Sequence, residues 1–199
     1  MTANYQSAHE RLKVLAGLSG AFFFGSSLSA VFGFSAGTLR QSLHRWARDG
    51  LIIPLGARAD AYLNTYHPDH AAAVESAVLA LHPSALVIGH QVLYEAGVTA
   101  QAPATIDIAT RRRGPGIFGF RVHVIPASKH AALARQVQAI TIGKIPRVAP
   151  RAACDAARSL DVLSLDDDDI DWDAMPAAKR AAKRAAKRAA KPKPRKAAV

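Results

Sequence analysis

The sequence predicts an α+β fold, and three observations lead to this prediction. Within the first 66 residues, the expected elements follow in the order helix, strand, helix, turn, helix and hairpin. The stretch that follows mixes helical spacing with alternating segments, which is typical of a second, small α+β unit. After Leu160 the composition changes abruptly, first to Asp and then to Ala, Lys and Arg. The expected divisions are 1–67, 68–160, an acidic linker at 161–176 and a disordered basic tail at 177–199.

Local signals define the first three elements. Ser7 and Glu10 have the spacing of a capping box, so a helix is expected to begin there. The three Phe residues at 22–24 are expected to form a short buried strand that pairs with the later hairpin. Ser26 or Ser27 then begins a brief second helix.

The third expected helix spans 36–49 and has two contrasting faces. Ser35 is a suitable N-cap, and Gly50 supplies a left-handed exit. One face carries apolar residues at steps of three and four, which are Leu39, Leu43, Trp46 and Ala47. The opposite face carries polar and basic residues, which are Arg40, Gln41, His44, Arg45 and Arg48. Such a face meets water or an anion, so the helix is either a solvated amphipathic helix or one that binds DNA.

A hairpin with a basic tip follows this helix at once. The short runs 51–54 and 61–66 are joined by 56–60, with Arg58 at the tip. Together with the short helix upstream, this order favours a winged helix-turn-helix that reads DNA. In the major groove, Arg pairs with guanine and Gln with adenine. We expect base contacts from Arg40, Gln41, His44 and Arg45, and contacts to phosphates or the minor groove from Thr38, Arg48 and Arg58.

The charge of the chain favours an acidic partner. The formal net charge is +11, and it is still +8 without the ten basic residues of 177–199 and the seven Asp of 161–173. A basic body points to nucleic acid or another acidic surface. The single Cys excludes an intramolecular disulfide and fits a reducing cytosol. No apolar run approaches the length of a membrane helix, and we expect a cytoplasmic, nucleoid-associated bacterial protein without a membrane partner.

The second unit begins after Pro68. Asp69 is expected to cap a helix that ends at His82, directly before Pro83. The later elements are expected to be a strand at 85–88, a short helix through Ala96, strands at 105–109 and 118–124, a helix at 131–137, an extended segment at 140–145 and a helix at 151–160. This mixture of elements does not define a topology.

Two further segments are strongly basic. Arg111, Arg112 and Arg113 form a second basic patch, which either extends the DNA footprint or is a solvated turn. The tail resembles the Lys/Ala-rich tails of linker histones, and we expect it to neutralise phosphates without sequence preference. A tail that serves only solubility is the alternative. The tail cations expected to act in this way are Lys179, Arg180, Lys183, Arg184, Lys187, Arg188 and Lys191.

Neither a metal site nor catalysis is expected. The run at 166–169 lacks the alternating ligands, the Gly and the distal Glu of a calcium loop, and is interpreted as a solvated strip that the tail can contact when DNA is absent. The GxGxxG, Walker, GxSxG and HExxH motifs are missing from the sequence. Asp107 is a single carboxylate, and Cys154 is expected in the core. We therefore expect no enzyme and no cofactor.

Three segments of the second unit carry a family resemblance. ALVIGHQVLYEAG at 85–97, TIDIATRRR at 105–113 and RAACD at 151–155 resemble the core of AbiEi-type antitoxins, and the resemblance covers roughly residues 7–173. It implies an N-terminal winged helix that represses the chain's own promoter. It also implies an antitoxin partner to a nucleotidyltransferase-type toxin, without a necessary stable complex. The short second unit and the Ala-Ala-Lys-Arg tail depart from the family pattern.

The resulting interpretation is a sequence-specific DNA-binding autorepressor, with double-stranded DNA as its partner and a type IV antitoxin role implied by the resemblance. Two other classes remain open. One is a histone-like protein whose tail provides most of the DNA affinity. The other is a protein-interaction module that does not read DNA.

Overall fold

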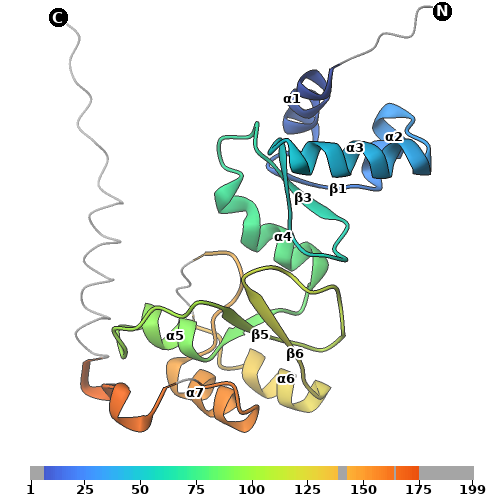
Figure 1. The fold of residues 1–199 in the computed structure, drawn as a ribbon. Coiled ribbons are helices and arrows are strands. Elements are labelled where there is room, and N and C mark those ends of the chain that lie inside the picture. Colours follow the sequence, from blue (N-terminus) through green and yellow to red (C-terminus); the bar gives the residue numbers. More distant parts are fainter. Residues whose placement is uncertain (1–6, 139–142, 164, 175–199) are drawn as a thin grey trace, which may run out of the picture.

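Two three-stranded sheets organise the α+β fold of the protein (Figure 1). The computed structural model describes residues 7–174, apart from 139–142 and 164. The helices are α1 (Ala8–Ser19), α2 (Ser27–Phe32), α3 (Ala36–Arg48), α4 (Val74–Leu81), α5 (His90–Glu95), α6 (Ala127–Ala134) and α7 (Pro150–Ser159). The strands are β1 (Phe22–Phe24), β2 (Ile52–Pro54), β3 (Ala61–Asn64), β4 (Leu86–Ile88), β5 (Ile106–Thr110) and β6 (Phe120–Val124).

The first sheet has the order β1-β3-β2 and is antiparallel throughout. As the sequence predicts, the strand of three Phe residues pairs with the hairpin, and Phe23 lies opposite Tyr62. One face of this sheet packs against α1, α2 and α3. Leu12, Leu15 and Trp46 are buried in the core between them.

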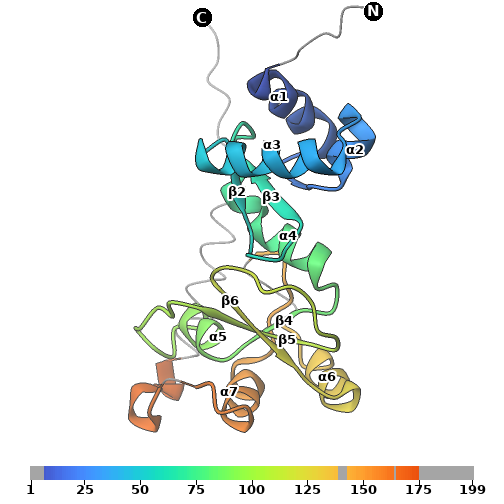
Figure 2. The ribbon, with the colours of Figure 1, turned by 45° about the vertical axis from the view of Figure 1, so that its right-hand side comes forward.

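The opposite face of the first sheet also contributes to a hydrophobic core. Because side chains alternate along a strand, Phe22 and Phe24 point away from Phe23, and they pack with Leu63 against the second core. That core also contains residues of α4, β4 and β5, and α4 lies between the two sheets in both views (Figures 1 and 2). The N-terminal elements and the second unit therefore share one hydrophobic core.

The second sheet has the order β4-β5-β6 and is mixed. The strands β4 and β5 are antiparallel, whereas β5 and β6 are parallel, with Asp107 opposite Arg121. The helices α5 and α7 pack on each other, and α7 also contacts β4. The described residues contain no helix that is long and apolar enough to cross a membrane.

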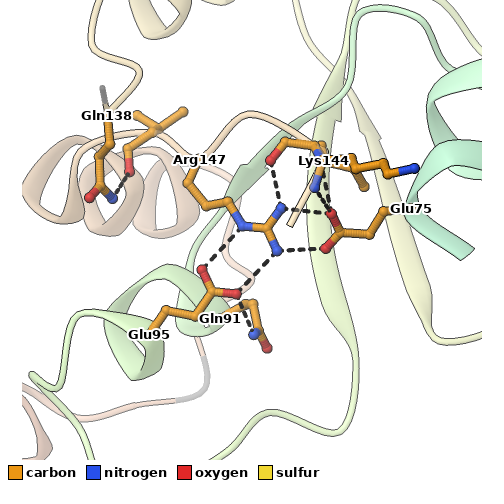
Figure 3. Close-up of polar contacts among 8 residues, drawn as sticks. Glu75, Gln91, Glu95, Gln138, Lys144 and Arg147 are labelled. Atoms are coloured by element: carbon orange, nitrogen blue, oxygen red, sulfur yellow. Dashed lines mark hydrogen bonds and ion pairs between the residues drawn. The ribbon is translucent and has the colours of Figure 1, made fainter. Parts of the chain in front are cut away.

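A buried ion-pair network fastens α4, α5 and the segment before α7 (Figure 3). The Arg147 side chain is only 4% exposed and lies between Glu75 and Glu95. Its Nη2 donates to Glu75 Oε1 at 2.6 Å and to Glu95 Oε1 at 3.1 Å, while Nε donates to Glu95 Oε2 at 3.1 Å. Glu75 Oε2 also accepts hydrogen bonds from the backbone N–H groups of Lys144 and Ile145. Nη1 donates to Glu75 Oε2 at 3.1 Å and to Ile145 O at 2.6 Å, so every nitrogen of the buried guanidinium has a partner, as a buried charge requires.

The acidic segment packs against the second unit where the structure describes it. Leu165 and Ile170 are buried with Leu93 and Val98, and the Asp171 N–H donates to Val98 O at 2.8 Å. Asp166, Asp168 and Asp169 are exposed, as expected for a solvated strip, but a 3-10 turn forms at Asp167–Asp169 where no compact structure was expected. Its apolar flanks hold the turn against the core, which outweighs the repulsion among the carboxylates.

Three expected elements differ from the structure. The helix expected to be capped by Asp69 begins at Val74, after a 3-10 turn at Ala71–Ala73, and no side chain caps it. The helix expected at 131–137 is α6, which starts earlier because Pro126, with its fixed φ, occupies the N-cap position. Residues 143–145 form bends where an extended segment was expected, and 139–142 lie outside the described residues.

Candidate nucleic-acid interface

The helix α3 is defined at both ends by the expected residues. Ser35 Oγ accepts a hydrogen bond from the Thr38 N–H at 3.3 Å, which satisfies one free donor of the first turn. Beyond the C-terminal end, Gly50 has a φ of +71°, a conformation that favours glycine. The side chains of Leu43 and Trp46 are buried against the first sheet and the other helices. These contacts fix the rotation of α3 about its axis, and hence which face is exposed.

The exposed face of α3 carries all six predicted site residues of this helix. Each of them is exposed in the structure: Thr38, Arg40, Gln41, His44, Arg45 and Arg48. Within the described part of the chain, the side chains of Arg40, Gln41, His44 and Arg45 make no hydrogen bond or ion pair. Arg48 forms an exposed pair with Asp49 at 3.0 Å, and Thr38 Oγ1 lies 2.9 Å from Ser35 Oγ. The face is therefore polar, basic and available to a partner.

The turn before α3 is braced by an aromatic cluster. The Phe34 ring lies 6.1 Å from the Trp46 ring, and the Arg11 guanidinium stacks over Phe34 at 4.7 Å. Arg11 belongs to α1, so this contact ties the first helix to the start of α3. Sequence reasoning missed this role of Arg11, because its spacing along α1 gives no sign of a ring 23 residues away.

The hairpin tip is held from two sides. The Asp60 carboxylate accepts a hydrogen bond from the Ser26 N–H at 2.9 Å, which ties the hairpin to the start of α2. On the other side, the Phe118 N–H donates to Leu55 O at 2.8 Å. Arg58, predicted at the tip, is exposed. The hairpin is thus not a free wing, because one flank lies against the second unit.

The second basic patch lies apart from α3. Arg111, Arg112 and Arg113 are exposed and directly follow β5. Both views place the first sheet and α4 between α3 and β5 (Figures 1 and 2). The three arginines line a cavity of about 380 Å³ together with Leu81 and the three residues after it. The predicted tail cations, Lys179 to Lys191, lie outside the described residues.

A histidine–carboxylate pair in the second sheet was missed. His123 Nε2 lies 2.7 Å from Asp107 Oδ1, and Arg121 Nη1 lies 3.8 Å from the same oxygen. The parallel register of β5 and β6 brings these three residues to one face of the sheet. The alternation along 118–124 places Arg121 and His123 on one face of the strand. That Asp107 lies beside them depends on the pairing of β5 with β6, which the sequence does not reveal.

The described residues contain neither a metal-binding cluster nor a reactive thiol. Among the described residues, no group of three or more His, Cys, Asp or Glu side chains is placed to hold a metal ion. Cys154 is buried as predicted, and burial raises the pKa of its thiol, which keeps it protonated and unreactive.

The sequence matches no protein-family model, and it matches no curated protein. The interpretation of the α3 surface therefore depends on the geometry and chemistry of the chain itself.

Proposed function

We propose that residues 8–66 form a winged helix-turn-helix that binds double-stranded DNA, with α3 in the major groove. The observation that carries this proposal is the exposed face of α3, on which Arg40, Gln41, His44 and Arg45 have no partner within the described structure. Leaving four such side chains unpaired on one rigid helix suits a surface that pairs with base edges. The order of the elements and the pairing of β1 with β3 support the winged-helix interpretation.

The proposed biological role is transcriptional repression of the chain's own promoter. Base contacts by α3 would provide sequence preference, whereas Arg48, Arg58 and the tail cations would contact phosphates. The antitoxin role implied by the AbiEi resemblance stays a prediction. The test is a neighbouring reading frame with nucleotidyltransferase motifs whose expression arrests cell growth. Relief of this arrest by co-expression of the present chain would support the antitoxin role. Unrelieved arrest would contradict it.

Replacing Arg45 by alanine is expected to weaken binding to the chain's own upstream DNA by about 1–3 kcal/mol and to relax sequence preference. The reason is that Arg45 is expected to contact a base in the upstream DNA that most random sequences lack, so its loss weakens binding to the upstream DNA more. Titration of labelled upstream and random duplexes measures both affinities. Arg135→Ala is the matched control, because Arg135 is exposed at the end of α6 and its loss removes the same charge. Equal losses on the two duplexes would exclude base reading by Arg45.

Removing residues 177–199 is expected to flatten the salt dependence of DNA binding and to leave the sequence preference intact. Each phosphate neutralised by Lys or Arg adds about 0.9 to the slope of log K against log salt concentration for duplex DNA. The measurement is a salt series on the upstream and random duplexes. If affinity collapses without the tail and no preference appears, the histone-like alternative is correct. If neither form of the chain binds DNA, the protein-interaction alternative gains support.

A further inference from the structure

The cavity beside the second basic patch is separate from the α3 surface. One wall comes from the end of α4, with Leu81, His82, Pro83 and Ser84. The facing wall is Thr110 and the three arginines that follow it. The DNA-binding proposal gives this cavity no role. Its volume of about 380 Å³ falls within the range of small-molecule sites.

The chemistry of the walls selects an anion. None of the described residues that line the cavity is acidic, and three of them carry a guanidinium. Ser84 Oγ accepts a hydrogen bond from the Arg111 N–H at 3.1 Å, which leaves its own hydroxyl hydrogen for a ligand. One guanidinium can bind two phosphate oxygens through two parallel N–H donors. Three guanidinium groups therefore offer more donors than a single phosphate requires. Leu81 and Pro83 add an apolar surface that a phosphate alone would not contact.

The backbone that carries the arginines is held in place, although the three arginine side chains are exposed. Thr110 Oγ1 donates to Arg112 O at 3.0 Å, and His82 Nε2 lies 2.9 Å from Pro115 O. Because a carbonyl only accepts, His82 donates through Nε2. Ser84 is held in turn from α6, where His130 Nε2 lies 2.7 Å from Ser84 O. Because the backbone is already fixed, ligand binding has a smaller entropic cost.

The close approach of the two walls supports the same conclusion. A Cβ built on Gly114 would lie 2.5 Å from His82 Cε1, so the segment after the arginines passes directly over the imidazole ring. At its far end this segment is bonded to the hairpin through Phe118 and Leu55. Residues 110–118 are therefore anchored at both ends, with the arginines projecting from the anchored part.

We propose that this cavity binds a nucleoside diphosphate or triphosphate, with the phosphates on Arg111, Arg112 and Arg113 and the nucleoside against Leu81 and Pro83. This site is independent of DNA binding by α3. The ligand is assigned as a free nucleotide because the arginines line a cavity together with apolar side chains, whereas a DNA backbone contact needs only an exposed basic surface.

The test is isothermal titration of the full chain with ADP, pyrophosphate and adenosine at physiological ionic strength, where exposed charges are screened. ADP is expected to bind more tightly than either fragment. The variant Arg112→Ala/Arg113→Ala is expected to weaken ADP binding by about tenfold or more, because it removes two charge-assisted contacts. Both side chains are exposed, so the fold is expected to remain, and circular dichroism checks this.

Arg40→Ala/Arg45→Ala on α3 is the matched control, since it removes the same charge from another exposed face. Unchanged ADP affinity in this variant supports the proposal. Equal weakening in the two double variants would show that overall charge attracts the nucleotide and would overturn the proposal. Pyrophosphate binding as tight as that of ADP would overturn the nucleoside contact. If the full chain does not bind ADP, the proposal is overturned. If Arg112→Ala/Arg113→Ala then also reduces DNA affinity as much as the α3 variant does, the patch belongs to the DNA-binding surface.

Discussion

Replacing Arg147 by alanine is expected to reduce the free energy of unfolding by about 3–5 kcal/mol. The guanidinium is buried between two carboxylates, and its removal leaves Glu75 and Glu95 close together without a counter-charge (Figure 3). The side chains of these glutamates are only 20% and 13% exposed, so water compensates little. Urea denaturation measures the loss as a shift of the midpoint.

The control for this prediction is Arg48→Ala. Arg48 also pairs with a carboxylate, but both partners are exposed, and the expected change is within about 1 kcal/mol. A similar small loss on replacing Arg147 would show that the buried network contributes little to stability.

The pH dependence of the Arg147→Ala effect follows from Glu75. Burial alone would raise the pKa of Glu75, but hydrogen bonds from Arg147, Ile145 and Lys144 outweigh burial and hold it below its usual value of 4.5. A lowered pKa in the folded state stabilises the protein above the unfolded-state pKa, and this contribution is lost as pH falls through the folded-state pKa. The difference in stability between wild type and Arg147→Ala is therefore expected to narrow below about pH 4.5. A difference that stays constant in acid would contradict this account.

Gly56→Ala is expected to destabilise the protein by about 1–3 kcal/mol. A Cβ at this position would lie 2.0 Å from Gly116 O and 3.0 Å from Gly116 C. Both are backbone atoms that cannot rotate away, so the hairpin and the segment before β6 must separate. Thermal unfolding measures the loss of stability.

The other side of this contact offers a matched control. Nothing lies within 4 Å of a Cβ built on Gly116, so Gly116→Ala fits without displacement. It is expected to be neutral or to stabilise by up to about 1 kcal/mol, because alanine restricts the unfolded chain. If both substitutions destabilise the protein equally, the loss of stability arises from replacing glycine in the backbone and not from the contact between Gly56 and Gly116.

The sequence predicts what depends on neighbouring residues and misses what depends on distant ones. The capping box of Ser7 and Glu10, the Ser35 cap and the Gly50 exit are all local, and each is found in the structure. The exposed face of α3 follows from helical spacing alone. The partners of Arg147 are 72 and 52 residues away in the sequence, and no periodicity indicates them.

The candidate sites show the same division. The arginines after β5 are visible as a run of three, but the wall at 81–84 is brought to them by the fold. The contact between the hairpin and the second unit was also missed, because glycine at positions 56 and 116 indicates a turn as readily as a close approach. In physical terms, strand order and the packing of one unit on another depend on non-local contacts that a single sequence does not reveal.

Because both faces of the first sheet contribute side chains to a hydrophobic core, the chain is expected to unfold in one cooperative transition. Separating the N-terminal elements from the rest would expose Phe22, Phe24 and Leu63 to water together. Evolution could not readily exchange residues 1–67 between proteins as a self-sufficient module, since any new neighbour would have to cover the same apolar surface. The surface that we propose to bind DNA therefore depends for its stability on the unit that carries the cavity beside Arg111, Arg112 and Arg113.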